Sequence, residues 1–174
     1  MANREALRDL QARLASRLQA ARTESVSAAW LAVKAGGANC LFPLSQSGEI
    51  FPLPSVQVVP YARAWFLGVV NLRGVLFGVV DLAGFMGEPS ARTESSLADA
   101  SVITFNAALD INCALLVDDL AGLRKREAFT KAAPAPAGSP VYFGSCLTDL
   151  NGVQWQEINL QSLSQVAEFL SISA

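Results

Sequence analysis

The fold of this chain is decided by residues 65–82, which read WFLGVVNLRGVLFGVVDL. Two apolar runs, rich in β-branched residues, flank the four residues Asn71, Leu72, Arg73 and Gly74. Runs of this kind are typical of paired strands, and Gly74 can adopt the positive φ that a tight turn requires. The stretch therefore predicts a β-hairpin near the middle of the sequence.

Further strands are predicted on both sides of this hairpin. The other runs with a strand pattern are residues 28–35, 38–44, 101–106, 111–117, 146–150 and 153–157. Gly36-Gly37 and Asn151-Gly152 separate neighbouring runs, and Asn-Gly is the strongest short hairpin signal in the chain. Residues 45–54 are rich in proline, which cannot donate to a ladder, and so predict an edge strand or an irregular connection.

A weak internal repeat connects two of these regions. Residues 30–44 and 103–117 align without gaps, and the alignment pairs the Asn-Cys dipeptide at 39–40 with the one at 112–113. In both segments a strand, a short turn and a second apolar strand follow in order. The repeat suggests two related β-units, built from short strands at intervals typical of barrels or sandwiches. Closure into barrels would remove exposed strand edges.

Helices are predicted at both ends of the chain. Leucines at positions 7, 10, 14 and 18 form one stripe of a helix over residues 4–22. This helix either packs on its own domain or docks a partner, and the spacing leaves both open. A last helix is predicted from about Leu160, with Leu163, Val166 and Leu170 on one side.

The middle of the chain contains two further local signals. Residues 81–86 predict one short helix, with Asp81 as its cap and Gly87 at its end. The polar residues 88–99 then divide the sequence in two.

Composition restricts the possible functions. Hydrophobic residues make up 52% of the 174 residues and charged residues 16%, which is enough apolar surface for a globular core. The net charge of −2 argues against general nucleic-acid binding. No run approaches the roughly 20 apolar residues of a spanning helix, and the N-terminus lacks a signal-peptide core. Three widely spaced cysteines suit free thiols. We therefore expect a cytoplasmic protein without membrane insertion.

The residues that carry chemistry are sparse. The chain has no histidine, which removes the imidazole base of Ser-His-Asp and Cys-His catalysis and histidine-ligated metal sites. No glycine-rich phosphate motif is present. Asp118-Asp119 could in principle bind a hard cation, but the absent ligand spacing favours a strand end with one acid solvated. The basic run at 124–126 is interpreted as an exposed loop after a strand. No cofactor, metal site or catalytic residue is predicted.

Arg73 is the residue that the hairpin itself does not explain. A turn here needs Asn71 and Gly74, but it does not need leucine and arginine between them. An outward Arg73 beside an exposed Leu72 would have the composition of a protein-docking surface. Alternatively, the guanidinium only satisfies nearby backbone carbonyls. The residues alone leave these two interpretations even.

The quoted stretch resembles the signature of the CheW-like domain family. The resemblance rests on residues 65–76 and on the Val-Val-Asp-Leu at 79–82, with Gly78 where family members commonly carry proline. The segment LLVDDLAGL at 115–123 resembles the family's second-lobe strand, and the hairpin and helix around 151–170 resemble its closing element. The N-terminal extension, together with the Gly-Leu-Arg at 122–124, is similar to PilI-type adaptors of type IV pilus chemosensory systems.

The resemblance implies both a fold and a function. The fold would be mainly β, with two intertwined five-stranded SH3-like β-barrels and an N-terminal and a C-terminal helix. Residues 1–25 would be a helical extension, and 26–174 a CheW-like domain of two lobes with a polar break near 88–99. The protein would be a non-catalytic adaptor that couples the cytoplasmic tip of a methyl-accepting chemoreceptor to a CheA-type histidine kinase, controlling twitching motility.

The resemblance also implies a docking site. Asn71, Leu72, Arg73 and Gly74 fall where the family docks partners, with Arg73 as the principal contact. A flagellar chemotaxis adaptor, a small-ligand-binding β-barrel and, last, an enzyme using the acids at Asp118 stay as alternatives. Small barrels are usually filled by their own side chains, which weighs against the ligand-binding alternative.

Overall fold

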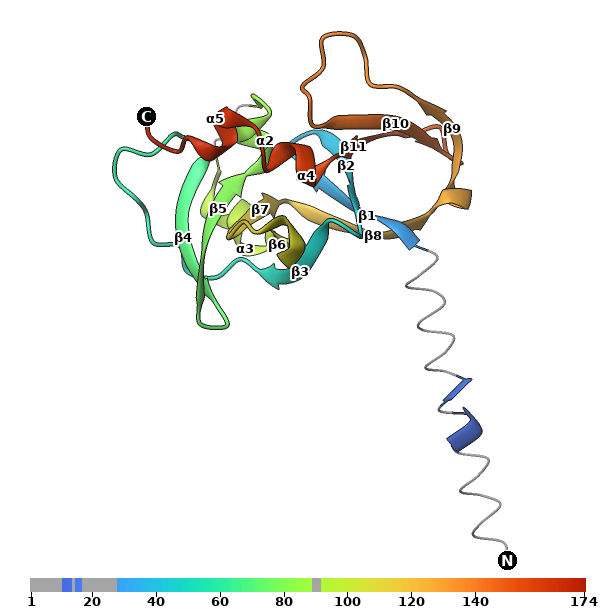
Figure 1. Cartoon of the computed structure of the whole chain (residues 1–174), viewed down its shortest axis with the longest axis horizontal. Coiled ribbons are helices and arrows are strands. Elements are labelled where there is room, and N and C mark those ends of the chain that lie inside the picture. Colours follow the sequence, from blue (N-terminus) through green and yellow to red (C-terminus); the bar gives the residue numbers. More distant parts are fainter. Residues whose placement is uncertain (1–10, 14, 17–27, 89–91) are drawn as a thin grey trace, which may run out of the picture.

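The strands form two sheets that lie side by side (Figure 1). The computed structural model describes residues 11–13, 15–16, 28–88 and 92–174. The six-stranded sheet contains, in spatial order, β8 (Asp119–Lys125), β1 (Ala28–Ala35), β2 (Ala38–Pro43), β11 (Gln154–Ile158), β10 (Phe143–Asp149) and β9 (Phe129–Ala133). The five-stranded sheet contains β3 (Ser47–Pro52), β6 (Ser101–Phe105), β7 (Cys113–Val117), β5 (Val75–Asp81) and β4 (Phe66–Leu72). The prediction of a mainly β fold is confirmed, and the first sheet has one strand more than predicted.

The internal repeat of the sequence corresponds to the two central hairpins. β1 and β2 pair antiparallel, as do β6 and β7. Each hairpin then continues its sheet through a parallel pair, β2 with β11 and β7 with β5. The order β1-β2-β11-β10 in one sheet therefore matches β6-β7-β5-β4 in the other. The two sheets are related units, as the repeat suggests.

The two units are intertwined because the chain changes sheet immediately after each central hairpin. From β2 it passes through three residues into β3, the edge strand of the five-stranded sheet. From β7 it passes through Asp118 into β8, the edge strand of the six-stranded sheet. Each sheet thus receives an edge strand from the hairpin of the other. The prolines of residues 45–54 accordingly lie in or beside an edge strand, β3, as predicted.

The central strands β1, β2, β6 and β7 are mostly apolar because most of their residues are buried on both faces. Alternate residues of a strand point to opposite faces. In β1, Leu31 and Val33 join a core between the two sheets, whereas Ala32 points into a separate core of the six-stranded sheet. In β7, Leu115 and Leu116 divide in the same way between the shared core and the core of the five-stranded sheet. A strand buried on both faces loses the usual apolar–polar alternation.

Each sheet also surrounds a core of its own. Side chains from all six strands form the smaller cluster, namely Ala32, Leu41, Ala121, Phe129, Leu147 and Trp155, with Trp30 beside them. All five strands of the other sheet contribute to its cluster in the same way. Beyond β3, the chain crosses to β4 and pairs with it at one bridge, where Gln57 and Val69 exchange backbone hydrogen bonds of 2.8 and 2.9 Å.

The helices are short. They are α2 (Leu82–Phe85), α3 (Glu94–Ala98), α4 (Leu160–Leu163) and α5 (Ala167–Leu170), with the 3-10 turns η1 (Ala107–Leu109) and η2 (Arg126–Ala128). The sequence predicted one continuous C-terminal helix. This is wrong, since residues 164–166 separate α4 from α5. This break shifts the helical phase, so that Phe169 is buried and Leu170 is exposed. Asn159 caps α4 by accepting a hydrogen bond from the Ser162 N–H at 2.9 Å.

The predicted N-terminal helix lies mostly outside the described residues. Residues 11–13 and 15–16 are helical and exposed. Within the part of the chain that the structure describes, no helix is long and apolar enough to cross a membrane.

Candidate docking site

The hairpin between β4 and β5 turns through two residues. Arg73 and Gly74 both have positive φ, 51° and 85°, which is the backbone of a type I′ turn and matches the twist of the flanking strands. The Asn71 side-chain oxygen accepts a hydrogen bond from the Gly74 N–H at 2.8 Å. Asn71 and Gly74 therefore account for the geometry of this turn.

Leu72 is buried, and the prediction that it would be exposed beside Arg73 is wrong. Only 6% of its surface is accessible, because β4 continues as far as Leu72 and its alternation points this side chain into the core of the five-stranded sheet. The exposed apolar side chains near Arg73 come from β5. Val75 is partly exposed and Leu76 exposes 62% of its surface. The apolar component of the surface was placed on the wrong strand by reading the motif alone.

The Arg73 side chain extends from the β4–β5 hairpin toward β3, the strand at the other edge of the same sheet. Its Nη1 lies 2.9 Å from Oε1 of Glu49 on β3, and its Cζ lies 5.5 Å from the centre of the Phe51 ring. Its side chain nevertheless exposes 74% of its surface. An ion pair this exposed contributes about 0–1 kcal/mol, so stability alone gives little reason for an arginine here. The guanidinium donates its hydrogen bond to a carboxylate, and not to the backbone carbonyls of the alternative interpretation.

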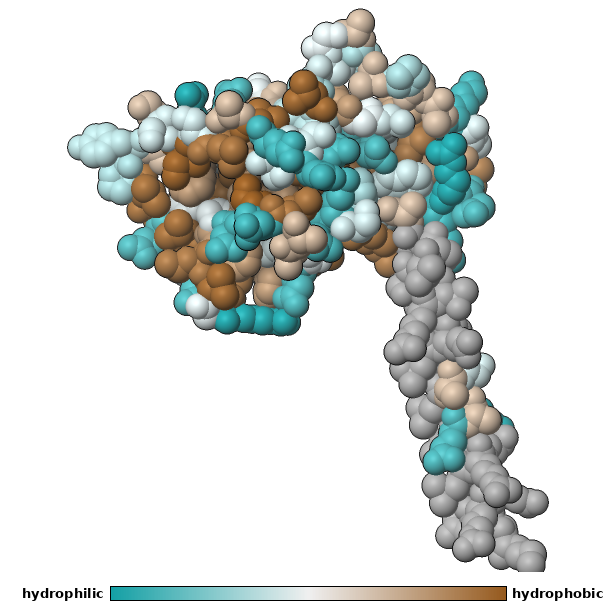
Figure 2. All heavy atoms as spheres, viewed as in Figure 1, coloured by the Kyte–Doolittle hydropathy of each residue, from teal (hydrophilic) through white to brown (hydrophobic). Residues whose placement is uncertain are grey.

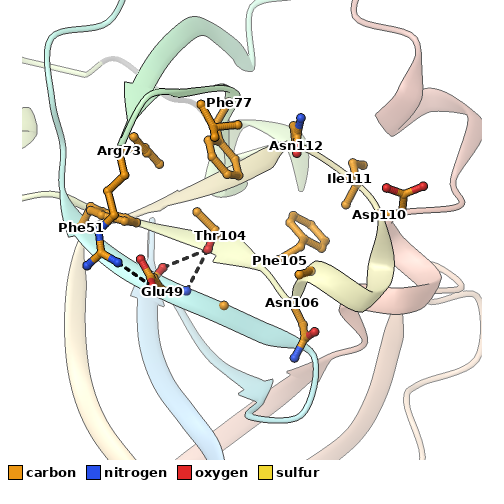
Figure 3. A pocket seen from close by; sticks show the side chains of 14 residues that line it. Glu49, Phe51, Arg73, Phe77, Thr104, Phe105, Asn106, Asp110, Ile111 and Asn112 are labelled. Carbon is orange, nitrogen blue, oxygen red and sulfur yellow. Dashed lines mark hydrogen bonds and ion pairs between the residues drawn. The ribbon is translucent and has the colours of Figure 1, made fainter.

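An open groove of about 630 Å³ lies beside Arg73 (Figure 3). It is bounded by β3, by the β4–β5 hairpin and by residues 104–112, and three aromatic side chains, Phe51, Phe77 and Phe105, line it. Arg73 and Asp110 lie on opposite sides of it. The apolar side chains that reach the surface gather over the five-stranded sheet in Figure 2. The groove is open at the surface, whereas the interiors of both sheets are filled by their own side chains.

Sequence reasoning missed a buried ionic cluster at the far end of β5. Asp81 has no accessible surface, and Arg92 binds it through Nη2–Oδ1 and Nε–Oδ2 contacts of 2.5 and 3.0 Å. Arg92 Nη1 also donates to Oδ1 of Asp118. Asp118 Oδ2 accepts a 2.5 Å hydrogen bond from the Gly36 N–H, in the β1–β2 turn of the other sheet. The cluster thus joins the two sheets.

This cluster corrects the prediction that Asp81 caps α2, whereas Asp118-Asp119 lie at a strand end with one acid exposed, as predicted. Asp81 precedes α2, but its side chain makes no capping hydrogen bond because both of its oxygens bind Arg92. Asp118 uses both carboxylate oxygens on Arg92 and Gly36, while Asp119 is exposed at the start of β8. Among the described residues, no group of three or more His, Cys, Asp or Glu could hold a metal ion. The signal in the sequence was the Val-Asp dipeptide at the ends of two strands, Val80-Asp81 and Val117-Asp118. The two carboxylates need a cation nearby, and Arg92 of the polar segment 88–99 supplies it.

The basic run at 124–126 was predicted to be a loop after a strand. This is wrong for Arg124 and Lys125, which belong to β8. Arg124 is half-buried, with its Cζ 5.6 Å from the centre of the Trp155 ring. This side chain covers one end of the core of the six-stranded sheet. Lys125 and Arg126 are exposed.

The three cysteines are free thiols. Cys40 and Cys113, the equivalent residues of the internal repeat, are both buried, and burial raises the pKa of each thiol to about 12. Cys146 on β10 is half-buried. The two repeat cysteines therefore serve as small apolar core residues.

Comparison with known proteins connects these features to a family. The family described as CheW-like domain matches residues 29–168. Protein PilI of Pseudomonas aeruginosa is 31% identical over 113 residues, a match that spans 64% of this chain and 61% of PilI. The crystal structure of the scaffolding protein TtCheW from Thermoanaerobacter tengcongensis superposes with a TM-score of 0.62 at 15% identity, covering 81% of this chain and 94% of that protein. The structural likeness extends across both sheets.

Proposed function

Because the chain belongs to the CheW-like domain family, we propose that it is a non-catalytic scaffold of chemosensory signalling. In this proposal it couples the cytoplasmic tip of a methyl-accepting chemoreceptor to a CheA-type histidine kinase. Residues 26–174 act as one domain with two lobes, and residues 1–25 are an extension of it. The similarity to PilI supports a place in a type IV pilus system that controls twitching motility.

The observation that carries this proposal is the exposure of Arg73. The hydrogen bond that closes the turn joins Asn71 and Gly74 and does not use the Arg73 side chain, whose ion pair with Glu49 is exposed. Arginine beside partly exposed apolar side chains, here Val75 and Leu76, is the usual composition at the centre of a protein interface. Of the four residues assigned to docking, Asn71 and Gly74 shape the turn, Leu72 anchors it in the core, and Arg73 contacts the partner.

The test is the charge reversal Arg73→Glu. We expect the variant to keep the fold, because an exposed ion pair contributes little to stability. Binding to the receptor's cytoplasmic fragment or to the kinase should weaken by about 2 kcal/mol or more, the loss typical of an interface hot spot. Isothermal titration calorimetry with each purified partner measures this loss, and circular dichroism checks the fold.

Arg126→Glu is the matched control, since Arg126 is an exposed arginine in η2, the turn that joins two strands of the other sheet. It should leave both affinities unchanged. A folded Arg73→Glu protein that binds both partners as tightly as the unaltered chain would remove Arg73 from the docking site.

A further inference from the structure

We propose that the contact between Arg92 and Asp118 is an ionic clasp between the two sheets, which opens and closes while each sheet stays folded. Arg92 is held by a partner in the five-stranded sheet, and Asp118 is held by partners in the six-stranded sheet. The ion pair between them joins the two halves. The clasp is a conformational device of the scaffold itself, whatever partner the protein binds.

The first half of the clasp belongs to the five-stranded sheet. Asp81 ends β5 and has no accessible surface, and Arg92 binds both of its carboxylate oxygens through contacts of 2.5 and 3.0 Å. Removing the cation from such a pair leaves a buried charge without compensation, which is costly. The pair of Asp81 and Arg92 therefore stays closed, and it holds the guanidinium at the end of β5.

The second half belongs to the six-stranded sheet. Asp118 lies at the crossing from β7 to β8, and its backbone N–H donates to Lys34 O on β1 at 2.8 Å. Its Oδ2 accepts a 2.5 Å hydrogen bond from the Gly36 N–H in the β1–β2 turn. The Asp118 side chain thus fixes this turn of the six-stranded sheet to Arg92.

The β1–β2 turn lies directly on α2, which follows β5. A Cβ atom at Gly36 would lie 3.1 Å from the Ala83 Cβ and 3.4 Å from the Glu88 Cγ, so glycine permits this close approach. The apolar core shared by the two sheets holds them together elsewhere. Opening is therefore local, since it separates Asp118 from Arg92 and releases the turn from α2. A partner that contacts both the turn and α2 would favour one of the two states.

Exposure and charge decide which contact of the cluster opens. The Arg92 side chain exposes 13% of its surface and the Asp118 side chain 28%, whereas Asp81 exposes none. Two carboxylates share one guanidinium, so the cluster has a net charge of −1 (1 − 2). Water and salt ions reach the Asp118 end and weaken an ion pair there. Breaking this contact leaves the fully buried carboxylate still paired.

The internal repeat provides an equivalent junction made of neutral groups. The alignment of residues 30–44 with 103–117 makes the β2–β3 crossing equivalent to the β7–β8 crossing. At this crossing the Gln46 carbonyl accepts a hydrogen bond from the Asn106 N–H, in the connection from β6 to β7, at 2.8 Å. The Gln46 side chain accepts another from the Leu160 N–H, at the start of α4, at 2.7 Å. Salt has little effect on bonds between neutral groups, so the Leu160 amide serves as an internal reference.

Amide hydrogen exchange of the full-length chain, read residue by residue by NMR, tests the clasp without any partner. Raising the salt concentration from about 0.05 M to about 1 M should speed exchange of the Gly36 amide severalfold relative to the Leu160 amide, because salt screens the ion pair. Arg92→Lys keeps the charge beside Asp81 but lacks the planar fork that contacts both acids. It should speed Gly36 exchange about tenfold, although it alters neither atom of the Gly36–Asp118 bond.

Asp118→Asn removes the charge at the other half and should make Gly36 exchange faster and independent of salt. Asp119→Asn is the matched control, since Asp119 is the neighbouring exposed acid, and it should behave like the unaltered chain.

The outcomes separate a clasp from a cluster that only stabilises the fold. Faster exchange of Gly36 in Arg92→Lys and Asp118→Asn, with the amides of Leu160 and of Leu115 in β7 as slow as in the unaltered chain, supports the clasp. Equal acceleration of all three amides overturns it, because the whole fold is then loosened. Gly36 exchange that is insensitive to both salt and Arg92→Lys also overturns it. None of these measurements uses a partner, so the result is independent of the proposed function.

Discussion

The hairpins β4–β5 and β10–β11 occupy equivalent places in the two sheets and turn through similar sequences, Asn71-Leu72-Arg73-Gly74 and Asp149-Leu150-Asn151-Gly152. Both begin with a residue whose side-chain oxygen accepts hydrogen bonds from the turn, and both end with a glycine of positive φ, 85° at Gly74 and 80° at Gly152. The two ends of the motif thus serve the turn in either sheet.

The residues between the two ends differ. Leu72 is buried, whereas Leu150 exposes 73% of its surface. Asn151 occupies the place of Arg73 in the sequence motif, and a stable hairpin forms with it. The second hairpin therefore shows that a hairpin can form at this place in a sheet without an arginine, although its turn has one residue more, since the Asp149 N–H donates to Val153 O at 2.9 Å. The comparison supports the assignment of Arg73 to recognition.

The hairpins also differ at their far ends, and here the largest effect on stability is expected. β5 ends in Asp81, which is fully buried and bound by Arg92, whereas β11 ends in the apolar Ile158. Arg92→Met leaves the Asp81 carboxylate buried without its cation. We expect a loss of about 3–5 kcal/mol in the free energy of unfolding, measured by urea denaturation.

A neutral version of the cluster provides the control. Combining Arg92→Met with Asp81→Asn and Asp118→Asn removes all the charges together, and replacement of a whole buried cluster is often close to neutral. The triple variant should therefore be more stable than Arg92→Met alone. Equal stability of the single variant and the unaltered chain would show that the cluster is not essential to the fold.

Exchanging the third residue of the two motifs tests the comparison itself. Arg73→Asn should leave stability within about 1 kcal/mol, because Asn-Gly suits a type I′ turn and the lost ion pair is exposed. Binding of the receptor fragment or the kinase should nevertheless fall about 30-fold, as for a hot-spot arginine. The reciprocal Asn151→Arg should not alter either affinity. Calorimetric titration of both variants measures the effects, and a loss of binding confined to Asn151→Arg would reverse the assignment.

The acid of the second hairpin makes its turn sensitive to pH. The indole N–H of Trp155 donates to Asp149 at 3.0 Å, and the backbone N–H groups of Val153 and Asn151 donate to it as well. These bonds lower the pKa of Asp149 below its usual value of 3.8, with the Trp155 bond as the largest cause. The stabilisation is therefore complete above pH 3.8 and is lost as the pH falls through the folded-state pKa.

Asp149→Asn should accordingly destabilise the protein at pH 7 and have a smaller effect at pH 3. The first hairpin provides the control. Asn71 does not titrate, so Asn71→Ala should lower the free energy of unfolding by the same amount at pH 7 and at pH 3. Urea denaturation at the two pH values measures this. An Asp149→Asn effect that stays constant with pH would contradict the assigned cause of the pKa shift.

The smallest expected effect concerns the repeat cysteines, which differ from Cys146 in reactivity rather than in stability. The thiolate is the reactive form, and the raised pKa keeps Cys40 and Cys113 protonated at pH 8. We expect the aromatic disulfide reagent DTNB to react with Cys146 alone in the native protein and with all three thiols in urea. Rapid native reaction of a second thiol would show that one repeat strand is less protected than its burial indicates.

The strands and turns of this protein could be predicted because their signals are local. Residues 28–35 were placed within the bounds of β1, and Gly74 and Gly152 marked the turns that require positive φ. The Asn-Cys repeat correctly indicated two related units, since equivalent strands face equivalent cores. The break between α4 and α5 was missed because three apolar residues at helical spacing do not reveal where a helix stops.

The site was predicted only in part. Arg73 was singled out because a turn does not require it, but the burial of Leu72 depends on how far β4 extends. Arg92 was missed because it lies in a polar segment, and its two acids are distant in sequence.

The sequence by itself determined that this chain is a mainly β protein of the CheW-like family with an arginine at the tip of its central hairpin. Hydrophobic pattern and turn chemistry act over a few residues, so they can be read along the chain. Only the tertiary structure decided which side chains cover one another, because burial and ion pairing depend on partners brought together by the crossing of β3 and β8 between the sheets. Arg73 could be identified from the sequence. The groove beside it and the pairing of Arg92 with Asp81 form only when the chain folds.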